Sequence, residues 1–114
     1  MKLLRIKINF NRFNVKALID SDAATSVIAA DIFHKIDPLI IEQVNDDEIQ
    51  LKGFSSQVSK SLGRYNIKTK IDNKHMFIQG FYVVPFMQEQ CILGLDFLCN
   101  HGFVFDGRNR KISF

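Results

Sequence analysis

The sequence has no tryptophan, only two cysteines and two prolines, and no long apolar run. A membrane-spanning helix needs about 20 consecutive apolar residues, so a transmembrane protein is excluded. Cys91 and Cys99 are too few for a disulfide framework, and charges alternate with apolar side chains over residues 1–8, which predicts no signal-peptide core. We therefore expect an intracellular protein, cytoplasmic or nuclear, with both thiols buried.

Neither sign of charge dominates the chain. Fifteen Lys or Arg against twelve Asp or Glu give a formal net charge of +3. Nucleic-acid binding usually needs a dense basic stripe, and the one cluster in the sequence (Arg108, Arg110 and Lys111) reads as a solvated turn. We expect neither nucleic acid nor a membrane as a partner. The 114 residues, 46% hydrophobic and with eleven Phe, predict one domain (1–114) with a Phe-filled core.

Short alternating segments predict mainly strands. Residues 4–10 alternate apolar and polar side chains with the period of two that marks a half-buried strand, and a turn at 11–14 precedes a second strand at 15–19. Together with the elements given next, these strands predict an all-β fold, a closed and mainly antiparallel β-barrel with one or two short helices. Further strands are predicted at 49–52, 58–71, 76–84, 91–93, 103–105 and 111–114, a hairpin turn at 72–73, and helices at 29–36 and 96–101, the second ended by Gly102.

The most informative segment is residues 17–28, in which an apolar strand runs directly into Asp20. A buried strand that ends in a carboxylate is costly unless the acid is paired or takes part in chemistry. The residues alone leave two interpretations open. Either Asp20 or Ser21 caps a turn, or Asp20 is a functional acid.

This segment resembles the active-site loop of retropepsins, the single-domain aspartic proteases of retroviruses and long-terminal-repeat retrotransposons. Their pattern is an apolar strand, Asp-Thr/Ser-Gly-Ala, two variable residues, Ser or Thr, and two apolar residues. Residues 91–98 resemble the second motif of the family, apolar-apolar-Gly-x-Asp/Asn, and Leu95 favours the retrotransposon or domesticated branch. The matching residues are Asp20, Ser21, Ala23, Ser26, Val27 and Ile28 in the loop, and Ile92, Leu93, Gly94 and Asp96 in the second motif.

The resemblance implies a symmetric homodimer, because each chain of such an enzyme supplies one catalytic acid. Asp20 from the two chains would share a proton and act as base on a water and acid toward the peptide carbonyl. Ser21 would hydrogen-bond across the two-fold axis. Gly53, Phe54 and Ser55 would form the tip of a flap over an extended peptide, and no cofactor is expected.

Asp22 departs from the family pattern, which has Gly at this position. That Gly lets the backbone approach the partner loop and the substrate with no Cβ in the way. In a dimer, Asp22 would add two carboxylates beside the shared proton, so the dimer should be tightest at low pH. The candidate catalytic segment is therefore Asp20, Ser21, Asp22 and Ala23, with Asp20 as the acid or base.

Three interpretations of Asp22 remain open. The domain has kept its fold and dimer but lost catalysis, or it is active at acidic pH with a displaced loop, or the dimer is built differently and Asp22 points away. We favour the first, a dimeric module that binds a peptide or protein. The alternative is an active homodimeric aspartic endopeptidase.

Other groups carry weaker signals. Ser26 has no His at a motif position, which argues against a serine hydrolase. The acidic run at 45–48 is interpreted as a solvated turn. No spacing resembles a structural zinc site, so no metal is expected at Cys91, Cys99, His34, His75 and His101, and we expect core thiols and surface histidines instead. Packing in the strand core, rather than stacking on bases, is the expected role of Phe81, Tyr82 and Phe86.

Overall fold

The computed structural model describes residues 4–44, 50–51, 59–72, 74–101, 104–106 and 111–113. Its elements are β1 (Leu4–Phe10), β2 (Phe13–Ile19), β3 (Val27–Ala29), α1 (Ala30–Phe33), the 3₁₀ turn η1 (Pro38–Ile40), β4 (Ile41–Val44), β5 (Gln50–Leu51), β6 (Ser59–Lys60), β7 (Arg64–Ile71), β8 (His75–Val84), β9 (Cys91–Leu93), α2 (Leu95–Asn100), β10 (Val104–Asp106) and β11 (Lys111–Ser113).

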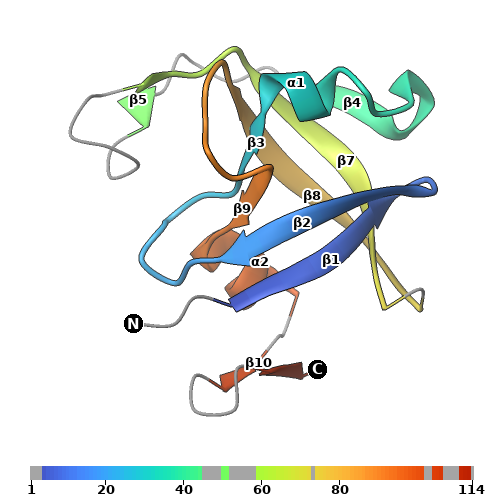
Figure 1. The fold of residues 1–114 in the computed structure, drawn as a ribbon, viewed down its shortest axis with the longest axis vertical. Helices are drawn as coiled ribbons and strands as arrows, with labels where there is room; N and C mark the ends of the chain where they lie inside the picture. The colour runs from blue at the N-terminus through green and yellow to red at the C-terminus, as the bar shows by residue number, and fades with distance from the viewer. Residues whose placement is uncertain are drawn as a thin grey trace.

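One seven-stranded sheet makes up most of the molecule, in the order β1-β2-β9-β3-β8-β7-β4. An additional pairing of β1 with β7 closes the sheet into a barrel, and β4 extends it along β7 (Figure 1). The predicted closed β-barrel with two short helices is confirmed. None of the helices in the described part of the chain is long and apolar enough to cross a membrane.

The hairpin of β1 and β2 follows from the local sequence. Asn11 and Arg12 have φ angles of 51° and 74°, the left-handed region that a two-residue hairpin turn requires. Phe10 therefore pairs directly with Phe13. The prediction that the turn lasts to residue 14 was wrong, because two residues suffice to reverse the chain.

The sheet is mixed rather than wholly antiparallel. Most pairings run antiparallel as predicted, but β2 pairs with β9 and β3 pairs with β8 in parallel. Strand β9 lies between β2 and β3, so the chain leaves β2, crosses the end of β9 and returns as β3 on the other side (Figure 1). The segment that makes this crossing is residues 20–26, the loop that the sequence marks as functional.

Phenylalanine fills the core, as predicted. Phe10 and Phe81 meet edge to face with ring centroids 5.9 Å apart, and both are at most 1% exposed. The main core cluster also contains Phe97 and aliphatic side chains from β1, β2, β7 and β9. Along β1, β2 and β7 core-facing residues alternate with outward-facing ones, and apart from Leu18 the outward-facing side chains are polar.

Several predicted elements have different bounds. The predicted strand 58–71 is interrupted at 61–63, where Gly63 has a φ of +129°. Only Ala30–Phe33 of the predicted helix 29–36 is α-helical, and the second helix begins at Leu95 rather than residue 96. Strand β4 was missed because its burial does not alternate. The candidate flap (Gly53, Phe54 and Ser55), residues 45–48, Gly102, Arg108 and Arg110 lie outside the described residues.

The Phe10–Phe81 contact gives a direct test of the core. Phe10→Ala is expected to lower the free energy of unfolding by about 3–5 kcal/mol, because it removes a buried ring and leaves a cavity. Phe86→Ala is the matched control, since Phe86 is 92% exposed, and we expect a change below about 0.5 kcal/mol. Urea denaturation measures both values. Equal losses in the two variants would contradict the core assignment.

Candidate active-site loop

Asp20 lies directly after β2, at the carboxyl end of two neighbouring parallel strands. Ile19 pairs with Leu93 of β9, and the backbone N–H of Asp20 donates to the Leu93 carbonyl at 3.0 Å. The Asp20 carbonyl accepts from the N–H of Ala23 at 3.1 Å, which closes a tight turn. The half-buried Asp20 carboxylate is thereby held at a fixed position at the edge of the barrel.

Asp22 fits this turn without backbone strain. Its N–H donates to Asp20 Oδ1 at 3.0 Å. The described non-glycine residues with positive φ are Asn11, Arg12 and Asp72, so Asp22 has an ordinary φ. The Asp22 side chain is exposed. A glycine at this position is therefore not needed to form the loop within one chain, and any conflict that Asp22 creates must arise with a second chain or a ligand.

Asp96 binds the far end of the same loop. Its Oδ1 accepts from Ser26 Oγ at 2.7 Å, and its Oδ2 accepts from the Ser26 N–H at 3.1 Å. Ser26 is fully buried, and its Oγ also accepts from the N–H of Gly94 at 3.1 Å. The two motifs that the sequence analysis singled out, 70 residues apart, are thus joined by short hydrogen bonds. Ser26 acts here as a structural link.

Gly94 is required because two backbones cross at this point. A Cβ on Gly94 would lie 2.5 Å from the Ala23 carbonyl oxygen and 2.7 Å from that of Thr25. The chain after Gly94 stays bound to the loop, since the N–H of Leu95 donates to the Ala23 carbonyl at 2.7 Å. The second motif therefore supports the loop from behind, in backbone contact.

Gln79 and His101 continue the hydrogen-bond network that begins at Ser26 and Asp96. Neither role was predicted from the sequence. Gln79 is 3% exposed, and its Nε2 donates to Asp96 Oδ2 at 3.2 Å. Its Oε1 lies 2.9 Å from His101 Nε2, and because an amide oxygen only accepts, the ring nitrogen donates. Burial lowers the pKa of His101, against the opposing effect of Asp96. The prediction of a surface histidine was wrong at His101.

A second, buried apolar cluster lies beside Asp20, on the face of the sheet opposite the main core. Leu18 is two residues before Asp20 and so lies on the same side of the strand. Phe86 follows β8 and is 92% exposed, which corrects the prediction that it packs in the strand core. The members of this second cluster are Leu18, Ala23, Val27, Tyr82, Val84 and Ile92, with Met87 packed against them.

The remaining candidate ligands do not come together. Cys91 is buried, and burial raises the pKa of its thiol far above the ordinary value. Cys99 is exposed, so the expectation that both thiols are buried was wrong for this residue. Within the part of the chain that the structure describes, no group of three or more His, Cys, Asp or Glu side chains is placed to hold a metal ion.

Comparison with known proteins agrees with this geometry. The aspartyl protease family model matches residues 1–106, and the chain belongs to this retropepsin-like family. The fold is similar to the crystal structure of the retroviral protease-like domain of Ddi1 from Leishmania major, with a TM-score of 0.77 and 20% sequence identity over 100% of this chain and 89% of that one. No curated protein sequence matches the chain.

Gly94 provides a test of the crossing. Gly94→Ala is expected to lower the free energy of unfolding by about 3 kcal/mol, because the new Cβ meets backbone carbonyls that cannot move aside. Gly80→Ala is the control, since its Cβ would meet mainly the flexible end of Arg64. Urea denaturation compares the two. A Gly94→Ala protein as stable as Gly80→Ala would show that the chains do not cross this closely.

Proposed function

We propose that this domain assembles as a homodimer that binds a peptide or protein inside the cell, and that Asp22 impairs its catalysis. The observation that carries the proposal is the position of Asp22, whose N–H binds the Asp20 carboxylate while its own side chain stays exposed. The loop fold is intact, so the proposed loss concerns chemistry rather than structure.

The homodimer follows from the number of acids. A retropepsin-like site uses two aspartates that share one proton, and the loop of a single chain offers Asp20 for that role. A two-fold axis beside Asp20 would bring the second Asp20 from another copy of the chain. In this assembly Ser21 would hydrogen-bond between the loops, and Ala23 would contribute to the apolar surface next to the axis.

Asp22 disturbs this arrangement electrostatically. Two unit charges about 5 Å apart at an effective dielectric constant of about 20 repel by roughly 3 kcal/mol. A dimer would place two Asp22 carboxylates beside the two Asp20 carboxylates, and the added charge competes for the shared proton. The Asp22 side chain also occupies volume where a glycine would leave room for the partner loop or a peptide backbone.

The second candidate function is an active aspartic endopeptidase, and one observation favours it. The Asp22 N–H already donates to Asp20, which orients the carboxylate. In this function the paired Asp20 residues would activate a water and protonate the leaving amine of an extended peptide.

A cleavage assay separates the two functions. We expect the parent chain to cleave a peptide library weakly from pH 4 to 7, and Asp22→Gly to raise kcat/KM by about 100-fold, the rate equivalent of roughly 3 kcal/mol. Asp22→Asn keeps the side-chain volume and removes the charge, so it shows which property matters. Cleavage must disappear when Asp20→Asn is added to Asp22→Gly.

Two results would contradict the proposal. A parent chain that cleaves as fast as Asp22→Gly, with cleavage lost in Asp20→Asn, would establish the endopeptidase instead. A folded, dimeric Asp22→Gly protein with no activity would show that Asp22 is not the cause of the impairment.

A further inference from the structure

Positive charge is concentrated on one part of the barrel surface. Residues 4–19 and 64–71 contain seven Lys or Arg and no Asp or Glu, although the whole chain has nearly balanced charges. These residues form β1, β2 and β7, and β1 pairs with both of the others. We call six of their outward-facing cations the basic face: Arg5, Lys7, Arg12, Lys16, Lys68 and Lys70.

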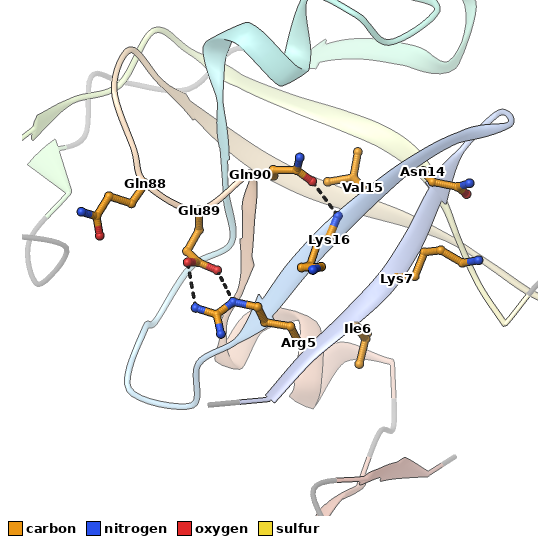
Figure 2. Close-up of a pocket in the computed structure, with 9 residues that line it drawn as sticks. All are labelled: Arg5, Ile6, Lys7, Asn14, Val15, Lys16, Gln88, Glu89 and Gln90. Atoms are coloured by element: carbon orange, nitrogen blue, oxygen red, sulfur yellow. Dashed lines mark hydrogen bonds and ion pairs between the residues drawn. The ribbon is translucent and has the colours of Figure 1, made fainter. Parts of the chain in front are cut away.

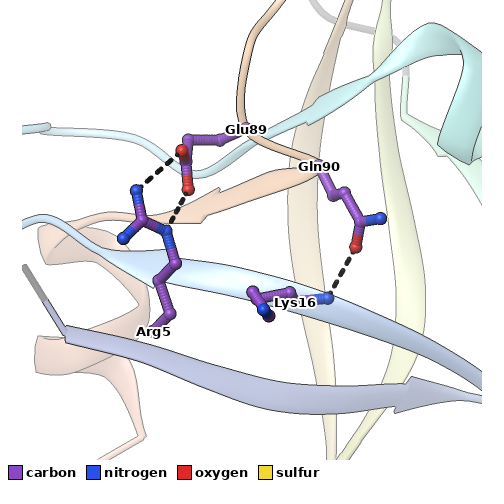
Figure 3. Close-up of polar contacts among 4 residues, drawn as sticks. All are labelled: Arg5, Lys16, Glu89 and Gln90. Carbon is purple, nitrogen blue, oxygen red and sulfur yellow. Dashed lines mark hydrogen bonds and ion pairs between the residues drawn. The ribbon is translucent and has the colours of Figure 1, made fainter.

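One hollow of about 480 Å³ lies at the end of the basic face that contains Arg5, Lys7 and Lys16. It is bounded by the β1–β2 hairpin and the loop at 85–90 (Figure 2). Arg5 is neutralised there by Glu89, through bonds of 2.8 and 3.0 Å that lower the pKa of the Glu89 carboxyl (Figure 3). Lys7 and Lys16 lie directly opposite each other on the paired strands. Neither forms an ion pair with any of the described residues.

A second hollow of about 350 Å³ lies at the other end of the hairpin and is lined by Arg12, Lys68 and Lys70. It opens where β7 changes partners, from β4 at Ile67 to β1 at Lys70. No carboxylate is among its lining residues. Asn11, which also lines this hollow, donates its side-chain N–H to Asp37 at 3.2 Å, and Asp37 caps η1.

The two hollows are neighbours. Asn14 lines the first and Asn9 the second, and their side chains are hydrogen-bonded at 2.8 Å. Like charges directly opposite each other on paired strands destabilise a sheet. A ligand that brings negative charges to both hollows would remove this repulsion and gain ionic contacts at several points along one path.

The linings indicate what kind of ligand this is. The second hollow adds apolar atoms to its cations, from Ile40 and the exposed Met76, whereas Ile6 and Val15 of the first hollow pack in or against the core. Neither lining includes an aromatic side chain on which a nucleobase would stack. This combination suits acidic residues interspersed with aliphatic ones.

We propose that the basic face binds an extended acidic segment of a partner protein. Such a segment advances about 3.3 Å per residue, so about ten residues would span both hollows along β1. The proposal goes beyond the proposed function and does not depend on Asp20 or on dimer formation.

Fluorescence anisotropy with a labelled peptide of about ten residues, rich in Glu and containing Leu, tests the proposal. A peptide with Gln in place of each Glu is expected not to bind. Lys16→Glu and Lys68→Glu should each weaken binding about tenfold, because each replaces an attraction with a repulsion. Lys35→Glu changes the net charge equally but lies outside the basic face, so we expect less than about a twofold effect. Asp20→Asn should bind like the parent chain.

Three results would overturn the proposal. Equal weakening by Lys35→Glu would show that only net charge matters. Failure of the Glu peptide to bind the parent chain at low salt would leave no ligand of this class. Displacement of the peptide by a lower concentration of a DNA duplex, with the same sensitivity to Lys16→Glu and Lys68→Glu, would assign the face to nucleic acid instead.

Discussion

The hydrogen bonds between Ser26 and Asp96 are the constraint on which the candidate site depends. They bind the start of β3 to the start of α2, so that β9 is enclosed between β2 and β3. Ser26 is fully buried and Asp96 is half-buried, and a carboxylate that loses contact with water needs other partners. Ser26, the Phe97 N–H and Gln79 supply them. Because Gly94 lets the backbones touch, the loop carrying Asp20 rests on the second motif with little freedom to move.

This rigidity determines which contacts Asp22 can disturb. A loop fixed from behind by Leu95 and Asp96 cannot easily shift to make room for a new side chain in front. Within one chain Asp22 needs no room, because its side chain is exposed and its backbone is unstrained. The consequences of the substitution therefore fall on what approaches the loop, a second chain or a peptide. The basic face lies on β1, β2 and β7 rather than on this loop.

Alternation of apolar and polar residues predicted the strands of the barrel. The loop at Asp20 and the second motif were singled out by the resemblance to retropepsins, because the residues alone left a turn cap and a functional acid both open. The sequence did not predict Gln79 or His101 as partners of Asp96, since a single polar residue in a strand has no signature until its neighbours are known. The break at Gly63 and the exposure of Phe86 were missed for the same reason. The parallel pairings of β2 with β9 and of β3 with β8 follow from the crossing of two distant segments, which no short pattern encodes.

The central claim is that Asp22 crowds the paired Asp20 residues in a homodimer. Sedimentation equilibrium at pH 5 and pH 8, on the parent chain and on Asp22→Asn, tests it most directly. At lower pH more of the clustered carboxylates are protonated, so their repulsion falls. The account predicts a parent dimer at least about tenfold tighter at pH 5, a difference of roughly 1.4 kcal/mol, and a much smaller difference for Asp22→Asn. A parent dimer equally tight at both pH values would contradict it.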